Sequence, residues 1–487
     1  MSEFLSVAKK NILKVACLLF IYEFVLILIG MTNFPYIDDT GRQIQGNTFF
    51  GAHYSRWGSE FLSWIVQGND HLTDLGIVTF ILSGIVLTFA SLILVYVLND
   101  KRIGWLPMIA SSLLGLNPWF LGCVSFRFDG PYMTVSVLSA IFPFLYWNKK
   151  GIFYPLSIIC IFLMCNTYQL SSGIYIVIVL TLLFKEFLQK ENIFHLLKTA
   201  LFSALSFSAG ILLFFFETKL NPEIAKRGAS VEIASLTELP ISFARNAHVY
   251  FATIYRQSSF HWKVLAVVLM IIFIGTCIKK SKITAIGTGI SAIVYLGLAS
   301  VLSYGVFLVF SASLAFSNPR YAYGFAAFFT ILLICMTDYS KTIGLKRVTR
   351  FTSVLFLYYL LSFPLVYAAQ LHFQYESFQN QSLQLSSDIS PYINDKRKTV
   401  ITSRLFKNSP ILVNSEQNFP MLNDLVTNNE WLYWPNNYLF NTISGLDVTF
   451  APHVHPENFS ASGKEKVVSN YFYDIYTTDQ ELYIINK

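Results

Sequence analysis

Charged side chains are scarce in this chain of 487 residues: Asp, Glu, Lys and Arg make up 13% of it, against 54% for hydrophobic types. The mean hydropathy is +0.51. An ordinary soluble domain carries about 25% charged residues, so this composition excludes a chain made only of soluble domains. The exception is the last stretch, about 371–487, which has no long apolar run and is rich in Asn, Ser and Asp. We expect this stretch to form a soluble domain.

Cysteine is sparse as well, and its placement is uninformative. All six cysteines lie in or beside apolar runs, and none follows Cys335. No spacing typical of a zinc or redox centre is present, so we expect neither a disulfide framework nor a resident cofactor. His453 and His455 lack a third ligand at a recognisable spacing, and we interpret them as surface residues. The net charge of +7 does not indicate nucleic-acid binding, because the basic residues form short tufts between apolar runs.

Long apolar runs dominate what is present. They recur between Ile12 and Gln370, and each is long enough to cross a hydrocarbon core of roughly 30 Å as a helix. Lipid offers no partner for backbone polar groups, so such runs must be helical. The sequence predicts a mainly α fold, a polytopic transmembrane bundle followed by a C-terminal α+β domain. We count eleven candidate spans, at about 12–33, 75–98, 104–123, 131–147, 152–168, 171–187, 193–216, 262–278, 284–311, 319–336 and 351–370.

The orientation of the bundle follows from its basic residues, which gather in every second loop, as at Lys149-Lys150 and Lys279-Lys280. Because loops rich in Lys and Arg stay in the cytoplasm, we expect a cytoplasmic N-terminus. An odd number of spans then sends the C-terminal domain to the outer side. Two long loops, 33–74 and 217–261, are expected on that side too. In the second, 235–255 favours an interfacial helix with Arg245 and His248 on its polar face.

An acidic couplet, Asp38-Asp39, stands directly after the first predicted span. Pro35 and Gly41 bracket it, which indicates a turn or a helix start. A helix-capping pair is one interpretation, since Asp is common at helix N-termini. A pair of carboxylates can also hold Mg²⁺ or Mn²⁺ through phosphate oxygens, so metal dependence is left open. A catalytic interpretation rests on the position beside a membrane span and on neighbouring side chains, namely Arg42, His53, Arg56 and Trp57.

Three further outer-side segments carry polar residues. Arg127 and Asp129 are the only charges of 117–132, and they form either a local ion pair or, through Arg127, a phosphate contact. Tyr168 and Gln169 offer uncharged donors suited to sugar hydroxyls, although a simple helix-end turn explains them equally. Arg320 begins a span, where it serves as an interfacial anchor or as a second phosphate contact.

Sugar transfer from a polyprenyl phosphate fits this set of residues. The leaving phosphate needs positive charge to stabilise it, for which the candidates are Arg42, Arg56, Arg127 and Arg320. The acceptor hydroxyl needs one general base, and a carboxylate can serve. A single displacement would invert the anomeric centre. The remaining polar residues are candidates for binding the substrates: His53, Trp57, Asp129, Tyr168 and Gln169.

These segments together resemble a known family. Tyr-Ile-Asp-Asp-Thr-Gly-Arg at 36–42, Asn-Pro-Trp-Phe at 117–120, Phe-Arg-Phe-Asp-Gly-Pro-Tyr-Met at 126–133, Thr-Tyr-Gln at 167–169 and Asn-Pro-Arg at 318–320 look like the GtrII-like, serotype-converting O-antigen glucosyltransferases of bacteria and phages. The resemblance covers about residues 1–370.

The resemblance implies a GT-C-type glycosyltransferase of the bacterial inner membrane, with residues 1–370 as its catalytic domain and 371–487 as a periplasmic domain. Such proteins take glucose from undecaprenyl-phosphate glucose on the periplasmic face and add it to O-antigen repeats. A flippase and a separate enzyme that makes the lipid-linked glucose normally accompany them. The family's catalytic acid lies in the first periplasmic loop, which matches Asp38 and Asp39. We favour Asp39 as the base, with Asp38 orienting it or the acceptor.

Two alternatives stay open on the sequence alone. A transporter or flippase for a polyprenyl-linked sugar would move substrate without forming glycosidic bonds, and such proteins often carry ionisable residues at the membrane midplane. A membrane assembly protein would depend on 371–487 and not on the acids of the first loop. The sequence names neither the sugar, the acceptor hydroxyl nor the role of the C-terminal domain.

Overall fold

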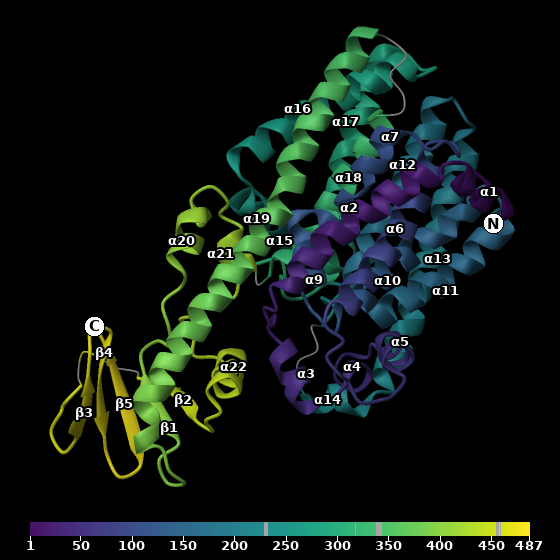
Figure 1. The fold of residues 1–487 in the computed structure, drawn as a ribbon. Coiled ribbons are helices and arrows are strands. Elements are labelled where there is room, and N and C mark those ends of the chain that lie inside the picture. Colours follow the sequence, from purple (N-terminus) through teal and green to yellow (C-terminus); the bar gives the residue numbers. More distant parts are fainter. Residues whose placement is uncertain (228–231, 317, 338–342, 454–456, 458) are drawn as a thin grey trace.

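The architecture is a bundle of long helices with a small sheet at one end (Figure 1). It is a computed structural model, which describes residues 1–487 except 228–231, 317, 338–342, 454–456 and 458. His455 therefore lies outside the described residues. Among the described residues, nine helices, some with an adjoining 3-10 turn, are long and apolar enough to cross a membrane. These helices are α2 (Ile12–Met31), α6 (Val78–Leu98), α11 (Lys150–Thr167), α12 (Ser172–Leu188), α13 (Ile193–Lys219), α16 (Phe260–Lys280), α17 (Ala285–Leu302), α18 (Tyr323–Thr337) and α19 (Ile343–Ile389).

The other two predicted spans are helical but irregular. The third is broken: α7 (Trp105–Ser111) and α8 (Leu113–Leu116) end before α9 (Pro118–Val124), which turns away by 58°. Pro118 disfavours a helical Asn117, whose side chain instead caps α9 by accepting from the Phe120 N–H. The fourth is the shorter pair α10 (Gly130–Ile141) and η1 (Phe142–Tyr146). All eleven predicted segments thus fall on helices, and the fold is mainly α and polytopic, as predicted.

Close packing of small residues holds the middle of the bundle together. Gly173 of α12 and Gly324 of α18 both lie against the carbonyl oxygen of Ser303, directly after α17, and neither leaves room for a Cβ atom. Membrane helices associate through such small residues, because lipid gives no hydrophobic reason for them to do so. The contact of both glycines with Ser303 fixes α12, α17 and α18 relative to one another.

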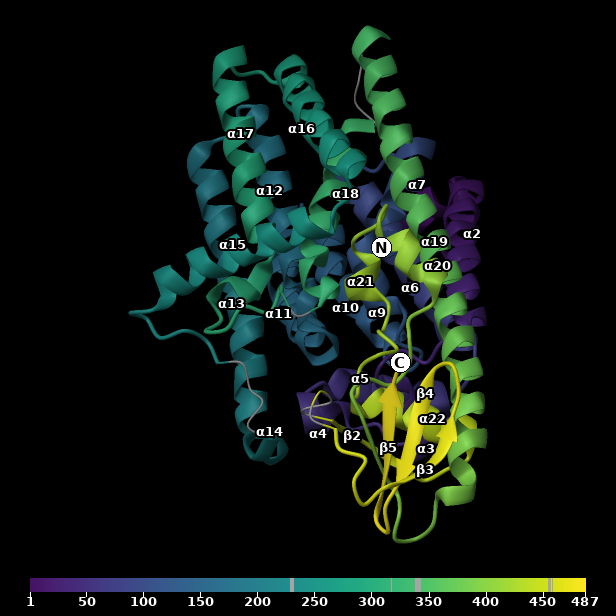
Figure 2. The ribbon, with the colours of Figure 1, turned by 90° about the vertical axis from the view of Figure 1, so that its left-hand side faces the viewer.

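Short helices occupy the long loops, and both views place those of the first loop at the same end of the bundle as the C-terminal sheet (Figures 1 and 2). The N-terminal α1 (Ser2–Lys10) lies at the other end of α2. A helix, α15 (Leu239–Gln257), does form where an interfacial helix was predicted, and Arg245 and His248 are exposed on it; its place at a membrane interface stays a prediction. The first loop holds α3 (Asp39–Gln45), α4 (Phe50–Tyr54) and α5 (Trp57–Gln67), and the second holds α14 (Pro222–Arg227) and α15 (Leu239–Gln257).

The C-terminal part is α+β, as predicted, and α19 joins it to the bundle without a break. This helix of 47 residues runs past the domain boundary predicted at 370. Its last turns contribute Phe378, Leu385 and Ile389 to a second hydrophobic core. They pack with a mixed sheet of strand order β2-β1-β5-β4-β3, in which β1 runs parallel to β2 and β5 and the other pairs are antiparallel. The elements are η5 (Ser390–Tyr392), β1 (Thr399–Thr402), α20 (Pro410–Glu416), α21 (Leu422–Leu425), α22 (Trp434–Ser444), β2 (Thr449–Pro452), β3 (Glu465–Ser469), β4 (Tyr473–Thr477) and β5 (Glu481–Asn486).

Candidate active site

Asp39 joins the first long loop to the turn between α9 and α10. It is completely buried, and its carboxylate accepts hydrogen bonds from the backbone N–H groups of Tyr36 (2.9 Å) and Arg127 (3.1 Å to each oxygen). Burial raises the pKa of Asp39 to about 8, although the two backbone N–H groups lower it. Both oxygens are therefore engaged by the protein itself, in an interior position.

Asp38 sits in a different environment. It is half-buried at the start of α3, and no side-chain capping bond is formed there. Burial raises the pKa of the Asp38 carboxyl, and the nearby charge of Asp129 raises it further. Three guanidinium groups act in the opposite direction, those of Arg42, Arg320 and Arg56. Asp38 is thus a partly accessible carboxylate in a group of arginines.

Arg42 and Asp129 form a buried ion pair between the two loops. The Arg42 Nε lies 3.1 Å from a carboxylate oxygen of Asp129, and both side chains are 8% exposed. Arg42 also donates to the carbonyl oxygen of Thr48 at 2.6 Å and lies over the Phe50 ring at 4.1 Å. The Arg42 guanidinium is therefore surrounded by partners from within the protein.

Arg127 pairs with the first loop and not with Asp129. Its Nη1 lies 2.7 Å from a carboxylate oxygen of Asp74, and its Nη2 donates to the side-chain oxygen of Asn33 at 3.0 Å. The sequence left open a local Arg127–Asp129 pair; in the structure each residue instead takes a partner from 33–74. Asp74 was missed because its partner lies 53 positions away in the sequence.

Arg56 and Arg320 differ from these two arginines. Within the part of the chain that the structure describes, neither has an ion pair with a carboxylate, whereas Arg42 and Arg127 each have one. Arg56 lies over the ring of Tyr168 at 4.6 Å, and Arg320 lies over the ring of Phe126 at 5.0 Å. The site therefore holds two arginines, one at the N-terminal end of α5 and one at the start of the α18 span, that have no carboxylate partner among the described residues.

The remaining predicted residues are distributed around this group. Tyr168 is 2% exposed and lies under Arg56, so it belongs to the cluster. Gln169 follows it at the start of the 3-10 turn η2 (Gln169–Ser171) and is half-buried. His53 stacks on Phe49 at 4.7 Å, and Trp57, 44% exposed, covers Gly51. The His53 ring thus belongs to α4, and the Trp57 ring, from the first residue of α5, lies against α4.

The C-terminal part also reaches the couplet, which the sequence did not indicate. The hydroxyl of Tyr36 donates to the carbonyl oxygen of Leu425 at 2.9 Å. The ring of Trp434, at the start of α22, lies against Gly41 of α3. The aromatic run Trp-Leu-Tyr-Trp at 431–434 was the available signal, because it interrupts a segment that is otherwise rich in Asn and Ser.

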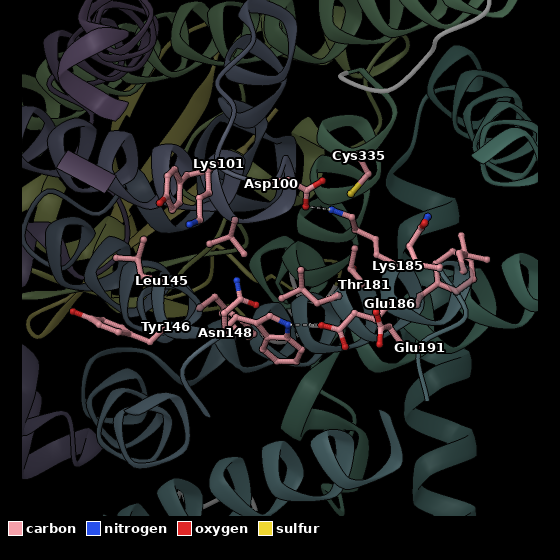
Figure 3. A pocket seen from close by; sticks show the side chains of 18 of the residues that line it. Asp100, Lys101, Leu145, Tyr146, Asn148, Thr181, Lys185, Glu186, Glu191 and Cys335 are labelled. Atoms are coloured by element: carbon pink, nitrogen blue, oxygen red, sulfur yellow. Dashed lines mark hydrogen bonds and ion pairs between the residues drawn. The ribbon is translucent and has the colours of Figure 1, made fainter. Parts of the chain in front are cut away.

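A cavity of about 630 Å³ lies at the opposite end of the bundle, beside α1 (Figure 3). Several of its charged groups have partners within the protein: Lys185 pairs with Asp100 at 3.1 Å, and Glu186 accepts from the Trp147 indole N–H at 2.8 Å. It lies at the loops predicted to be cytoplasmic and shares no lining residue with the couplet's surroundings.

Over the described residues, no group of three or more His, Cys, Asp or Glu side chains is arranged to hold a metal ion. His453 packs against the rings of Phe459 and Tyr483.

Comparison with family models matches residues 27–331 to the model described as Glucosyl transferase GtrII. The match spans more than half of the chain and includes every predicted site residue from Asp38 to Arg320, but it stops before the C-terminal part. No curated protein and no solved structure matches the chain.

Proposed function

Because the chain belongs to the GtrII glucosyl transferase family, we propose that it moves glucose from undecaprenyl-phosphate glucose to repeats of O-antigen or a related surface polysaccharide. The transfer takes place on the periplasmic side of the bacterial inner membrane and inverts the anomeric centre. One observation supports this most directly: a partly accessible carboxylate, Asp38, lies among arginines of which two, Arg56 and Arg320, have no carboxylate partner among the described residues.

Asp38 is the general base in this mechanism. It accepts the proton of the acceptor hydroxyl as that oxygen attacks the anomeric carbon, which requires a carboxylate within hydrogen-bond reach of the substrate. Asp38 is exposed enough to make this contact, whereas Asp39 is fully buried with both oxygens already accepting backbone hydrogen bonds. This reverses the order favoured by the sequence, and Asp39 becomes the residue that positions the couplet.

Arg56 and Arg320 stabilise the leaving phosphate. As the bond from the anomeric carbon to the phosphate oxygen breaks, negative charge grows on that phosphate. Preorganised cations in a site shielded from water stabilise such charge strongly. Tyr168 lies beneath Arg56 and limits its movement. With two arginines in this role the reaction needs no metal ion, and an assay with and without EDTA tests that point.

Arg42, Arg127 and Asp129 form the frame of the site in this proposal. Arg42 and Asp129 neutralise one another, and Arg127 is neutralised by Asp74, so these groups hold the two loops in register. Contacts of His53, Trp57 and Gln169 with the sugar remain predictions for mutagenesis. A flippase and a separate enzyme that makes the lipid-linked glucose are the expected functional partners.

The direct test compares the surface polysaccharide of cells with the protein, without it, and with the Asp38→Asn variant. We expect a mass increase of one hexose per modified repeat only with the unaltered protein. Movement of lipid-linked sugar across the membrane without any new glycosidic bond would instead identify a transporter. If the protein kept its function after substitution of Asp38 and Asp39 but lost it on deletion of 371–487, it would instead be identified as an assembly protein.

A further inference from the structure

A second cavity, of about 430 Å³, lies in the C-terminal part, beyond the segment that the family model matches. Aromatic side chains form much of its wall, together with Asn437, Asn441 and Asp447. Ligand sites typically combine apolar and aromatic walls with a few fixed polar groups. The aromatic lining residues are Trp431, Tyr433, Trp434, Tyr438 and Phe450.

The rings of this cavity are rigidly arranged and open to solvent. Trp431 and Tyr433 meet edge to face with centroids 5.7 Å apart, and Trp434 and Tyr438 do so at 5.8 Å. Yet Trp431 is 56% exposed and Trp434 is 48% exposed. Rings packed only for stability would be covered, because each offers a large apolar area to bury. Exposed ring faces suit the apolar C–H face of a sugar, whose hydroxyls then point toward the polar rim.

The floor of the cavity is held in place by two asparagines of α22. Asn437 donates to the carbonyl oxygen of Val448 at 2.8 Å and accepts from the Phe450 N–H at 2.7 Å. Asn441 donates to the same Val448 oxygen at 2.9 Å. These bonds tie α22 to β2, so the ring faces keep their positions without a ligand. Preorganisation of this kind lowers the entropy lost on binding.

The same rings touch the helix that carries the couplet. Trp434 lies against Gly41, and the Tyr438 hydroxyl accepts from the Gln45 side-chain amide at 3.4 Å. Gly41 and Gln45 follow Asp38 on α3, so at 1.5 Å per residue the rings begin roughly 5–10 Å along the helix from the proposed base. That spacing is comparable to one or two sugar units. The nearby Asp38 carboxylate also contributes to the raised pKa of Tyr433, after burial.

We propose that the cavity lined by Trp431, Tyr433, Trp434 and Tyr438 binds the acceptor polysaccharide and directs one of its hydroxyls to Asp38. This inference rests on the proposed function, which it extends by naming the acceptor site. A membrane-anchoring role for the same aromatics is the rival explanation, since Trp and Tyr are common at the lipid boundary. The polar rim and the packing of α22 between α3 and β2, at the level of the sheet, favour a carbohydrate (Figures 1 and 2).

The test measures binding separately from transfer. Full-length protein in detergent micelles is titrated with surface polysaccharide purified from cells that lack this protein. Trp431→Ala is the informative variant, because that ring lines the cavity and precedes α22, whereas Trp434 and Tyr438 are the rings that contact Gly41 and Gln45. We expect about tenfold weaker polysaccharide binding and a raised KM for the acceptor, with an unchanged KM for the lipid-linked donor. Tyr471→Ala, an 86% exposed ring in the β3–β4 turn, is the matched control and is expected to bind normally.

The outcomes separate this inference from the proposed function. Equal binding by Trp431→Ala and the unaltered protein would overturn the acceptor site while leaving glucosyl transfer intact. The acceptor site would also be overturned if Trp431→Ala weakened only the binding of the protein to vesicles of phosphatidylethanolamine and phosphatidylglycerol, which would identify a membrane anchor. A protein that transfers glucose but shows no measurable polysaccharide binding would overturn it as well. Asp38→Asn that binds polysaccharide normally yet transfers nothing would support both. Bound polysaccharide without any transfer by the unaltered protein would count against the proposed function alone.

Discussion

Asp38 and Asp39 are adjacent in the chain but have opposite surroundings. Asp39 is completely buried, and both of its oxygens accept from the Arg127 backbone N–H on another loop. Asp38 is half-buried and lies among the guanidinium groups of Arg42, Arg56 and Arg320. Substitution of Asp38 and substitution of Asp39 should therefore have different consequences for the protein.

Asp38→Asn is expected to lower the transfer rate about 10²- to 10⁴-fold, the usual contribution of a general base, without changing the melting temperature. Asp39→Asn is expected to destabilise the protein by about 1–3 kcal/mol, because the new amide donor faces backbone N–H groups. Transfer assays and thermal unfolding in detergent measure the two effects. An inactive but normally stable Asp39→Asn, together with an active Asp38→Asn, would return the catalytic role to Asp39.

The pH dependence of transfer should report the Asp38 carboxyl. Burial, and then Asp129, raises its pKa above the usual value near 3.8. A base must be deprotonated to act, so kcat/KM should fall as the pH drops through this raised pKa. Arg320→Gln removes a group that lowers the pKa, and the ascending limb should move to higher pH in that variant. A limb at the ordinary aspartate value, unmoved by Arg320→Gln, would argue against Asp38 as the base.

The arginines should separate into two classes. Arg56→Gln and Arg320→Gln are expected to lower kcat about 10²- to 10³-fold at normal stability, because each removes a cation from the developing phosphate charge. Arg42→Gln is expected to cost about 3–5 kcal/mol of stability, because it leaves the buried Asp129 without its partner. Purified variants are compared by initial rates and thermal unfolding. Arg102→Gln, an exposed arginine in the loop between α6 and α7, is the control and should be unchanged in both.

The contact of two glycines with Ser303 should be sensitive to a single added methyl group. Gly173→Ala is expected to destabilise the bundle by about 1–3 kcal/mol or more, since the Cβ would meet backbone and not a movable side chain. Gly297→Ala on α17 is the matched control, because a Cβ there meets nothing within 4 Å. Membrane accumulation and thermal unfolding distinguish them. Equal behaviour of the two variants would mean that the helices can separate at little cost.

The positions of the helices were predictable because hydropathy is a local property of the chain. A run such as 78–98 must be helical wherever it lies in the membrane, and each predicted segment does fall on a helix. The break at Asn117 was not predicted, although Pro118 is visible in the sequence. Proline limits its neighbours only locally, and the packing of α9 decides whether the helix continues beyond it.

The sequence by itself determined the polytopic helical class, the α+β character of the C-terminal part and the set of polar residues from which a site would be made. Only the tertiary structure decided which of them face one another. Arg42 meets Asp129 across 87 positions, Arg127 meets Asp74, and Arg56 and Arg320 are left without a carboxylate among the described residues. The physical reason is that a charge is neutralised by whichever group folding brings within a few ångströms, and chain order does not specify that distance. The aromatic cavity is built within the C-terminal part, but it lies beside α3 only because α22 packs against a helix nearly 400 positions earlier in the chain.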